Sequence, residues 1–259
     1  MTDAPAPASA AAPTRTTAVF PALVSYTLRA CLPARRRLGL LAPALGAVLF
    51  GLLTHAVVSD SAERAFAQIA SAGLFGIILP IGCLVVGDAV LGAEVRAGTL
   101  HYTWLSPVPR WGIVLARWLA GSAVAVLWIA LPCALAAVVA GASAAAVPVF
   151  VAAAAGCAGY VALFAMIGAL SRRAVVWSLA VVILMERLLG AALAGIAQLS
   201  PGWLARQAYA GIGPQATELL RRGVPDGWSA VGRLALVSAI ALAIASWRLS
   251  HLRLVARSD

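Results

Sequence analysis

The sequence predicts an all-α integral membrane protein with six membrane-spanning helices. Composition, long apolar stretches and the distribution of arginine residues support this prediction. Of the 259 residues, 63% are hydrophobic and only 11% are charged, whereas a soluble domain carries about 25% charged residues. So few charges cannot cover a surface that faces water, so the bilayer must solvate much of the chain.

The N-terminal region is predicted to stay outside the hydrocarbon core. Residues 1–18 are rich in Ala, Pro, Ser and Thr and lack an apolar core, so we expect a disordered cytoplasmic tail and no signal peptide. Val19 to Leu32 is amphipathic, and the basic cluster Arg35 to Arg37 follows it. This pattern favours a helix that lies along the cytoplasmic surface of the membrane.

Six apolar stretches follow, and each reaches the ~17 to 25 residues that a spanning helix requires. They cover about 38–58, 67–87, 112–140, 147–170, 174–198 and 230–247. Pro43, Pro80 and Pro132 lie inside three of them. Proline is tolerated in a membrane helix where neighbouring groups satisfy the carbonyl that it frees, so we expect kinks at these positions.

The arginine residues predict the orientation of the chain, because Lys and Arg in short loops favour the cytoplasm. If both termini are inside, the cytoplasmic set is Arg15, Arg29, Arg35, Arg36, Arg37, Arg96, Arg110, Arg117, Arg172, Arg173, Arg248, Arg253 and Arg257. Only Arg64, Arg206, Arg221 and Arg222 then lie clearly outside. We therefore predict a multi-pass protein of a bacterial plasma membrane with both termini in the cytoplasm.

Two connections are too long to be simple turns. The external one, Ser200 to Ser229, contains Trp203 to Ile212 and then Pro214 to Arg222. The second piece has Pro at its start and Gly223 just after its end, which is typical of a short helix. We expect two short helices that cap the outer side or dip into the membrane.

The cytoplasmic connection, Asp88 to Arg110, carries the strongest functional signal. The second span can continue as a helix to about Arg96, stop at Gly98, restart with Thr99 as N-cap and end before Pro107. Such a helix would lie across the membrane surface and offer an apolar, aromatic face to a soluble partner. A plain helical hairpin with interfacial aromatic residues is the structural alternative.

Two patches resemble motifs of the ABC-2 type transporter permeases, and the resemblance covers roughly residues 20 to 250. Glu94-x-x-x-Gly98-Thr99-Leu100, followed by Pro107-Val108-x-Arg110, is similar to the E-x-x-x-G-T-L…P-V-S-R signature between their second and third spans. Leu184-Met185-Glu186-Arg187-Leu188-Leu189-Gly190, followed by Leu199-Ser200-Pro201, resembles a W-E-x-L-L-G…L-S-P run. Met185, Pro109 and His101 depart from the family pattern and bear on which ATPase is recognised.

The resemblance implies a transmembrane domain over residues 19–250 and a cytoplasmic C-terminal tail over 251–259. It implies the permease subunit of an exporter that pairs with a second copy or a paralogue and docks a soluble ABC ATP-binding subunit. ATP and magnesium would bind that subunit, and this chain would bind no cofactor. The implied coupling residues are Glu94, Arg96, Gly98, Thr99, Leu100, Tyr102, Trp104, Pro107 and Arg110.

Several other functions lack the residues that they require. All 19 basic residues are arginine, so the chain has neither a Walker lysine nor a Schiff-base lysine. The H-E-x-x-H metalloprotease motif is absent, and no catalytic residue is assigned. The net charge of +10 falls between apolar runs, which fits topology better than nucleic-acid binding. A non-transporting membrane anchor or assembly subunit and a secondary transporter remain open alternatives.

The cysteines are expected to be buried free thiols. Cys31, Cys83, Cys133 and Cys157 form no C-x-x-C pair and have no histidine at metal-ligand spacing. A free cysteine in an apolar segment behaves as a small hydrophobic residue. We therefore predict neither a disulfide nor a metal site.

Glu186 lies in the middle of the predicted fifth span, where a charge costs about 2.5 to 3.5 kcal/mol. The adjacent Arg187 points ~100° away on a helix and cannot pair with it as an i,i+4 neighbour would. Glu186 could line the transport path or a protomer interface, or form an ion pair that fixes helix packing, with His55 as one possible partner. Alternatively, the fifth span ends near Gly190 and both charges lie in the outer leaflet.

Overall fold

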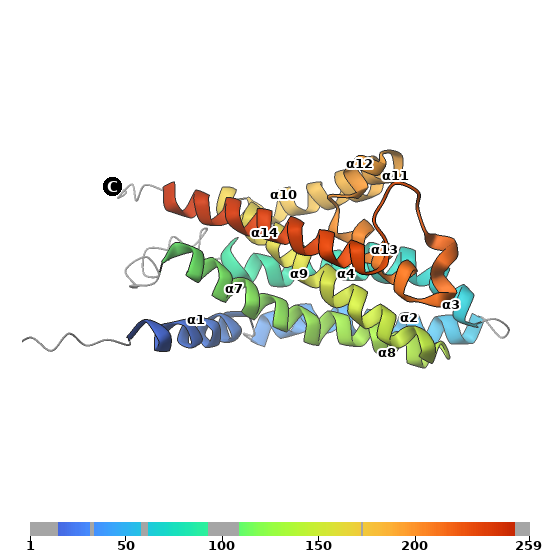
Figure 1. The fold of residues 1–259 in the computed structure, drawn as a ribbon. Helices are drawn as coiled ribbons and strands as arrows, with labels where there is room; N and C mark the ends of the chain where they lie inside the picture. The colour runs from blue at the N-terminus through green and yellow to red at the C-terminus, as the bar shows by residue number, and fades with distance from the viewer. Residues whose placement is uncertain (1–14, 32–33, 58–61, 93–108, 172, 252–259) are drawn as a thin grey trace, which may run out of the picture.

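The computed structural model describes residues 15–31, 34–57, 62–92, 109–171 and 173–251, and within them it contains helices and turns but no strand. The predicted all-α fold is therefore confirmed for this part of the chain. The long apolar helices run along the bundle in alternating directions, and the start of α1 (Arg15–Cys31) and the end of α14 (Gly227–His251) lie at the same end (Figure 1). Five described helices are long and apolar enough to cross a membrane: Gly39–Val57, Glu63–Gly92, Arg110–Val139, Ser143–Leu170 and Gly227–His251.

The outer surface of the bundle is apolar, as expected for a multi-pass membrane protein. Large hydrophobic side chains stay more than half exposed on α2 and on α14, among them Leu45, Leu49, Leu53, Leu236 and Ile240. Such a continuous apolar surface is not compatible with water and indicates contact with lipid or with another protein.

The first two helices depart from the predicted boundaries. α1 (Arg15–Cys31) begins before Val19, inside the expected disordered tail, and it packs against α7. α2 (Ala34–Val57) includes the basic cluster that was expected to precede the first span. A helix that is docked through one face can extend past its apolar residues, because each added residue contributes a backbone hydrogen bond at little entropic cost.

π-Helical turns interrupt the second and third passes at their prolines. The second pass consists of α3 (Ala62–Gly73), η1 (Leu74–Ile78), α4 (Leu79–Gly87) and η2 (Asp88–Gly92), and the third of α7 (Arg110–Ala125), η3 (Val126–Ala130) and α8 (Leu131–Val139). η1 and η3 end just before Leu79-Pro80 and Leu131-Pro132. Proline lacks an N–H and its ring crowds the preceding turn, and a wider turn relieves that crowding. Pro43 lies in a regular α-helix, so the predicted irregularity occurs at two prolines of the three.

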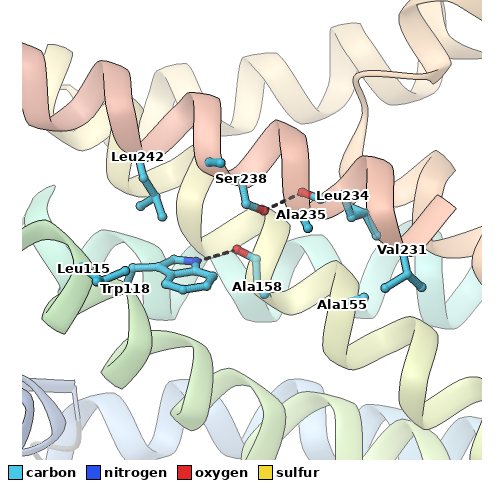
Figure 2. Close-up of a pocket in the computed structure, with 10 residues that line it drawn as sticks. Leu115, Trp118, Ala155, Ala158, Val231, Leu234, Ala235, Ser238 and Leu242 are labelled. Atoms are coloured by element: carbon cyan, nitrogen blue, oxygen red, sulfur yellow. Dashed lines mark hydrogen bonds between the residues drawn. The ribbon is translucent and has the colours of Figure 1, made fainter. Parts of the chain in front are cut away.

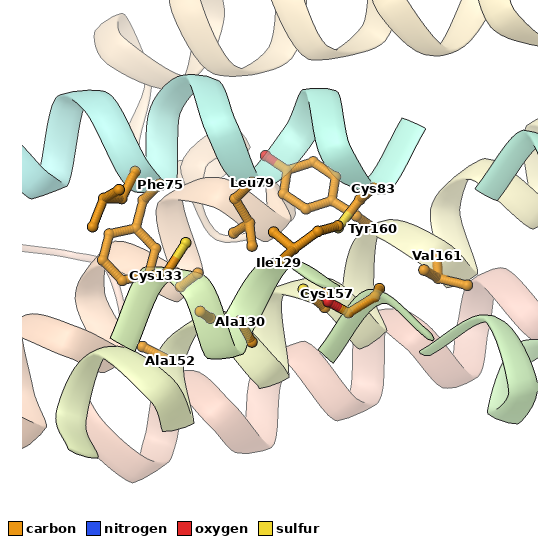
Figure 3. Packing of buried hydrophobic residues seen from close by; sticks show 14 of the residues in the cluster. Phe75, Leu79, Cys83, Ile129, Ala130, Cys133, Ala152, Cys157, Tyr160 and Val161 are labelled. Carbon is orange, nitrogen blue, oxygen red and sulfur yellow. Dashed lines mark hydrogen bonds between the residues drawn. The ribbon is translucent and has the colours of Figure 1, made fainter. Parts of the chain in front are cut away.

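α9 (Ala146–Leu170) is the central helix of the bundle. It follows the short 3-10 turn η4 (Ser143–Ala145) and packs against α4, α7, α8, α13 and α14 (Gly227–His251). Its small residues let neighbouring helices approach closely, and its Tyr160 lies in the core near Cys83 and Ile129 (Figure 3). Burial of this helix explains why it carries no polar face.

The predicted burial of the cysteines is confirmed. All four are buried and none forms a disulfide within the described residues, and Cys83, Cys133 and Cys157 lie in the apolar core drawn in Figure 3. The described residues contain no group of three or more potential metal-ligating side chains. These thiols therefore pack as small hydrophobic groups.

The predicted fifth span is broken rather than continuous from 174 to 198. It comprises α10 (Ala174–Val181), η5 (Val182–Leu189), α11 (Gly190–Ala192) and α12 (Ala194–Ala197). Leu193 has the extended angles φ −118° and ψ 114°, which end the helix at Ala192. The helix therefore ends near Gly190, as one of the three alternatives for this region stated.

The two short helices predicted after the fifth span are present with shifted ends. α13 (Pro201–Ile212) begins two residues early, and η6 (Pro214–Leu219) is a 3-10 helix that stops before Arg222. α13 packs against α9 and α14 (Figure 1). It therefore forms part of the bundle rather than only a cap on it.

α2 and α8 approach each other closely at Gly51. A Cβ atom added there would lie 2.5 Å from the carbonyl oxygen and 2.8 Å from the Cα atom of Ala136. Both atoms belong to backbone, which cannot rotate away as a side chain can. Only glycine allows the two helices to pack at this separation.

We expect Gly51→Ala to destabilise the protein by about 1 to 3 kcal/mol, because the helices must separate to accept the methyl group. Gly46→Ala on the same helix is the matched control, since nothing lies within 4 Å of its Cβ position. Thermal unfolding in detergent micelles measures both. Equal melting temperatures for the two variants would contradict the contact.

Candidate functional site

Glu186 on η5 is only 5% exposed and lies against the start of α13. Its Oε1 atom accepts hydrogen bonds from the Tyr160 hydroxyl on α9, from the Ser200 hydroxyl at 3.1 Å and from the Gly202 N–H at 3.1 Å. Three elements that are distant in the sequence therefore meet at one carboxylate oxygen.

The start of α13 is a favourable environment for a negative charge. The first N–H groups of a helix have no partner within the helix and carry partial positive charge. Ser200 is the N-cap and accepts the Trp203 N–H at 3.4 Å, while Pro201 occupies the first turn, where a missing N–H costs nothing. The guanidinium of Arg206, one turn further along, adds a favourable charge interaction with Glu186. Among the described residues, the groups that donate to Glu186 are thus the start of a helix and two hydroxyl groups.

The contact between the Glu186 carboxylate and the start of α13 requires glycine at position 202. A Cβ atom at position 202 would lie 2.5 Å from the Tyr160 hydroxyl oxygen and 2.7 and 2.8 Å from the two carboxylate oxygens of Glu186. Real Cβ atoms do not approach polar atoms so closely. Glycine therefore allows the carboxylate to reach the backbone of α13.

Trp203 makes a second contact between α13 and η5. Its indole N–H donates to the backbone carbonyl of Glu186 at 3.1 Å. The guanidinium carbons of Arg206 and Arg221 lie 5.0 and 4.7 Å from its ring centroid, within the range of cation–π interaction. The tryptophan thus connects η5 to two arginines that were expected to lie outside the membrane.

Arg221 also explains how the chain tolerates the break at Leu193. Its guanidinium donates to the carbonyl oxygens of Gly190 and Ala191, the latter at 2.9 Å. The last carbonyls of a helix have no intrahelical partner and carry partial negative charge, so a guanidinium satisfies them well. Gln207 holds Arg221 in place by accepting its backbone N–H at 2.9 Å.

Tyr209 is another buried residue of α13, and it stacks on Phe75 with ring centroids 5.5 Å apart. Burial, followed by the nearby negative charge of Glu63, raises the pKa of the Tyr209 hydroxyl to about 12. The hydroxyl stays protonated at neutral pH, and the ring acts as a packing group between α13 and η1.

The cavity beside Glu186 is small. It has a volume of about 50 Å³ and is lined by Leu163, Val181, Val182, Glu186, Leu199, Ser200 and Pro201. Ligand pockets usually enclose ~300 to 1,000 Å³. The carboxylate therefore faces a packed environment in this conformation, which favours the structural interpretation of Glu186.

Most of the predicted coupling residues lie outside the described residues. These are Glu94, Arg96, Gly98, Thr99, Leu100, Tyr102, Trp104 and Pro107. Arg110 is described: it begins α7, is exposed and donates to the Ser250 carbonyl on α14 at 2.9 Å. Of Arg187, the structure describes only the backbone, which belongs to η5. His55, considered as a partner for Glu186, lies beside Gly141 instead.

Arg117 was expected among the cytoplasmic arginines, but it is inside the bundle with 1% exposure. Its guanidinium donates to the Val90 carbonyl in η2 at 3.2 Å. Its position within an apolar stretch was the signal in the sequence that could have identified it as buried. Arg117 joins the third pass to the end of the second, just before the predicted coupling segment.

Comparison with known protein families and with curated proteins gives no match for this chain. The resemblance to ABC-2 type permeases therefore rests on the motif residues and on the order of the helices.

We expect Glu186→Gln to lower stability by only about 1 to 2 kcal/mol. All three donors reach the same oxygen, so an amide oxygen can accept them, and only the charge contribution is lost. Glu186→Leu should cost about 3 to 5 kcal/mol, because three buried donors lose their acceptor. Thermal unfolding in micelles measures both variants.

Tyr160→Phe is the matched control for this series, since it removes one donor and leaves the carboxylate with two. The loss of stability in Tyr160→Phe should be smaller than the loss in Glu186→Leu. Normal stability of Glu186→Leu would contradict the structural role. In that case, lost transport by the same variant would instead assign Glu186 to the pathway.

Proposed function

We propose that this chain is the membrane-spanning permease subunit of an ABC exporter of the ABC-2 type. It acts as a dimer with a second copy or a paralogue in a bacterial plasma membrane. A separate soluble subunit binds ATP and magnesium and hydrolyses the nucleotide. Substrate passes between the two membrane subunits as nucleotide binding shifts them between two conformations.

The place of the E-x-x-x-G-T-L…P-V-x-R motif in the chain carries this proposal. The motif occupies the connection between the second and third long apolar helices, and its described flanks are Gly92 and Pro109. Figure 1 places α7, which follows the motif, at the end of the bundle where α1 starts and α14 ends. A soluble ATPase that docks there would meet the connection and both ends of the described chain on one side.

The flanks of the connection are tied to the bundle, which supports its role in coupling. Arg117 binds the Val90 carbonyl before the connection, and Arg110 binds the Ser250 carbonyl after it. The backbone of Gly92 also lies against α9, because a Cβ atom on Gly168 would be 3.0 Å from the Gly92 nitrogen. A force applied to the connection by a docked subunit would therefore be transmitted to α7, α9 and α14.

Six passes are consistent with this proposal if the broken helix forms the fifth. At 1.5 Å per residue, the stretch from Ala174 to Ala192 is about 28 Å long, close to the ~30 Å of the hydrocarbon core. π-Turns occur in the second, third and fifth passes. Such turns often mark functional sites and hinges in helices, which suits a protein that alternates between two conformations.

We expect a membrane-impermeant maleimide, applied from outside, to label Glu218→Cys and to spare Ser250→Cys. Both residues are exposed, and they belong to opposite ends of the bundle, on η6 and at the end of α14. The four native cysteines are buried and should react little. Labelling of both sites after permeabilisation is the control. The reverse pattern would place the termini outside and overturn the coupling assignment.

We expect Gly98→Val to reduce the ATP hydrolysis that co-purifies with this chain by about tenfold or more, while membrane insertion stays normal. A β-branched residue disfavours the positive φ that a helix-ending glycine commonly adopts. The measurement is magnesium-dependent ATPase activity of the complex purified through this chain from its native membrane.

Gly232→Val is the matched control, because nothing lies within 4 Å of its Cβ position on α14. Its co-purifying activity should equal that of the unmodified chain. If the unmodified chain retains no ATPase under conditions that preserve its dimer, the membrane-anchor or secondary-transporter alternative replaces the proposal. If the ATPase activity that co-purifies with Gly98→Val equals that of the unmodified chain, this turn has no coupling role.

A further inference from the structure

A cleft of about 360 Å³ lies between α7, α9 and α14. Figure 2 shows Leu115 and Trp118 of α7 on one wall, Ala155 and Ala158 of α9 at the base and Leu242 of α14 on the other wall. Ala239, which is exposed, also lines the cleft. The cleft therefore opens toward the surroundings of the bundle.

The polar atoms at the cleft are already bonded within the protein. The indole N–H of Trp118 donates to the Ala158 carbonyl at 2.9 Å, and the Ser238 hydroxyl donates to the Leu234 carbonyl at 2.8 Å (Figure 2). What remains for a ligand is hydrocarbon surface contributed by alanine, leucine and tryptophan. The cleft thus fits an apolar ligand that brings no hydrogen-bonding groups of its own.

The size of the cleft favours a flexible chain over a protein helix. Its volume is near the lower end of the ~300 to 1,000 Å³ of ligand pockets. One turn of an α-helix with side chains is about 10 to 12 Å wide and 5.4 Å long, so it takes up more volume than the cleft encloses. A lipid acyl chain, in contrast, is narrow and is the commonest apolar molecule beside a membrane helix.

One end of the cleft carries positive charge. α7 and α14 run in opposite directions, so Arg110, five residues before Leu115, lies near the end of α14. Its guanidinium connects α7 to α14 by donating to the Ser250 carbonyl, and Arg110 is exposed, so its positive charge lies at the surface of the bundle. Trp111 is 62% exposed and shares a helix face with Leu115 and Trp118. A basic and an aromatic residue at one end of an apolar cleft are typical of the headgroup level of a membrane.

We propose that this cleft binds one anionic phospholipid, with an acyl chain between α7 and α14 and the phosphate at Arg110. The proposal requires only that the chain lies in a membrane and holds whether or not the protein is an ABC permease. The bound lipid fills the gap between the third and sixth passes where the small side chains of α9 leave space.

Native mass spectrometry of the full-length chain in detergent tests the proposal, with dioleoyl phosphatidylglycerol and dioleoyl phosphatidylcholine as probes. We expect a retained single-lipid adduct and about a fivefold preference for the anionic lipid, from one arginine at the membrane surface. Ala239→Phe should remove the adduct by filling the cleft. Ala243→Phe is the matched control, since Ala243 is exposed on the same helix but does not line the cleft.

Arg110→Gln should keep an adduct but bring the preference for the anionic lipid close to one. Melting temperatures of the two phenylalanine variants, which should agree, show that both are folded. Equal adducts in Ala239→Phe and Ala243→Phe would overturn the acyl-chain site. An unchanged lipid preference in Arg110→Gln would overturn the headgroup site. A loss of dimer mass in Ala239→Phe alone would show that a second protein copy occupies the cleft instead.

Discussion

A carboxylate in an apolar bundle must be neutralised or solvated, and the arrangement around Glu186 follows from that constraint. The charge costs several kcal/mol in hydrocarbon unless donors surround it. Here, one oxygen accepts hydrogen bonds from the hydroxyls of Tyr160 and Ser200 and from the Gly202 N–H in the first turn of α13. Because a helix terminus can serve this role only from close by, α13 has to enter the bundle rather than lie across its surface.

Several irregular features of the chain are consequences of the insertion of α13 into the bundle. The broken helix that begins at Ala174 stops at Ala192, and the chain then turns so that Pro201 can begin α13 beside η5. Arg221 satisfies the carbonyls left open at the break, and Trp203 lies against Arg206 and Arg221. Buried polar groups in a membrane are stable only when each has a partner. The break, the buried charge and the arginines therefore form one compensated unit.

The arginine residues that predict membrane topology also take part in the packing of the helices. Loop charge predicts orientation, and it treats all arginines in a connection as equivalent. In the structure, Arg117 is buried against Val90, Arg110 bridges α7 and α14, and Arg221 caps a broken helix. Each donates to a backbone carbonyl of a neighbouring element. A guanidinium suits this task because it offers several donors in a fixed plane.

The sequence alone predicted the helical class, five of the six expected spans as apolar helices long enough to cross a membrane, the two short helices after residue 200 with shifted ends, and the burial of the four thiols. These features depend on local composition, on bilayer thickness and on Pro and Gly signals. Only the tertiary structure decided the partners of Glu186, the break at Leu193 and the role of Gly51 among many glycines. The physical reason is that these depend on contacts between segments far apart in the chain: Tyr160 and Ser200 lie 26 and 14 residues from Glu186. No local pattern encodes which helix terminus will reach which carboxylate, because packing of the whole bundle sets that distance.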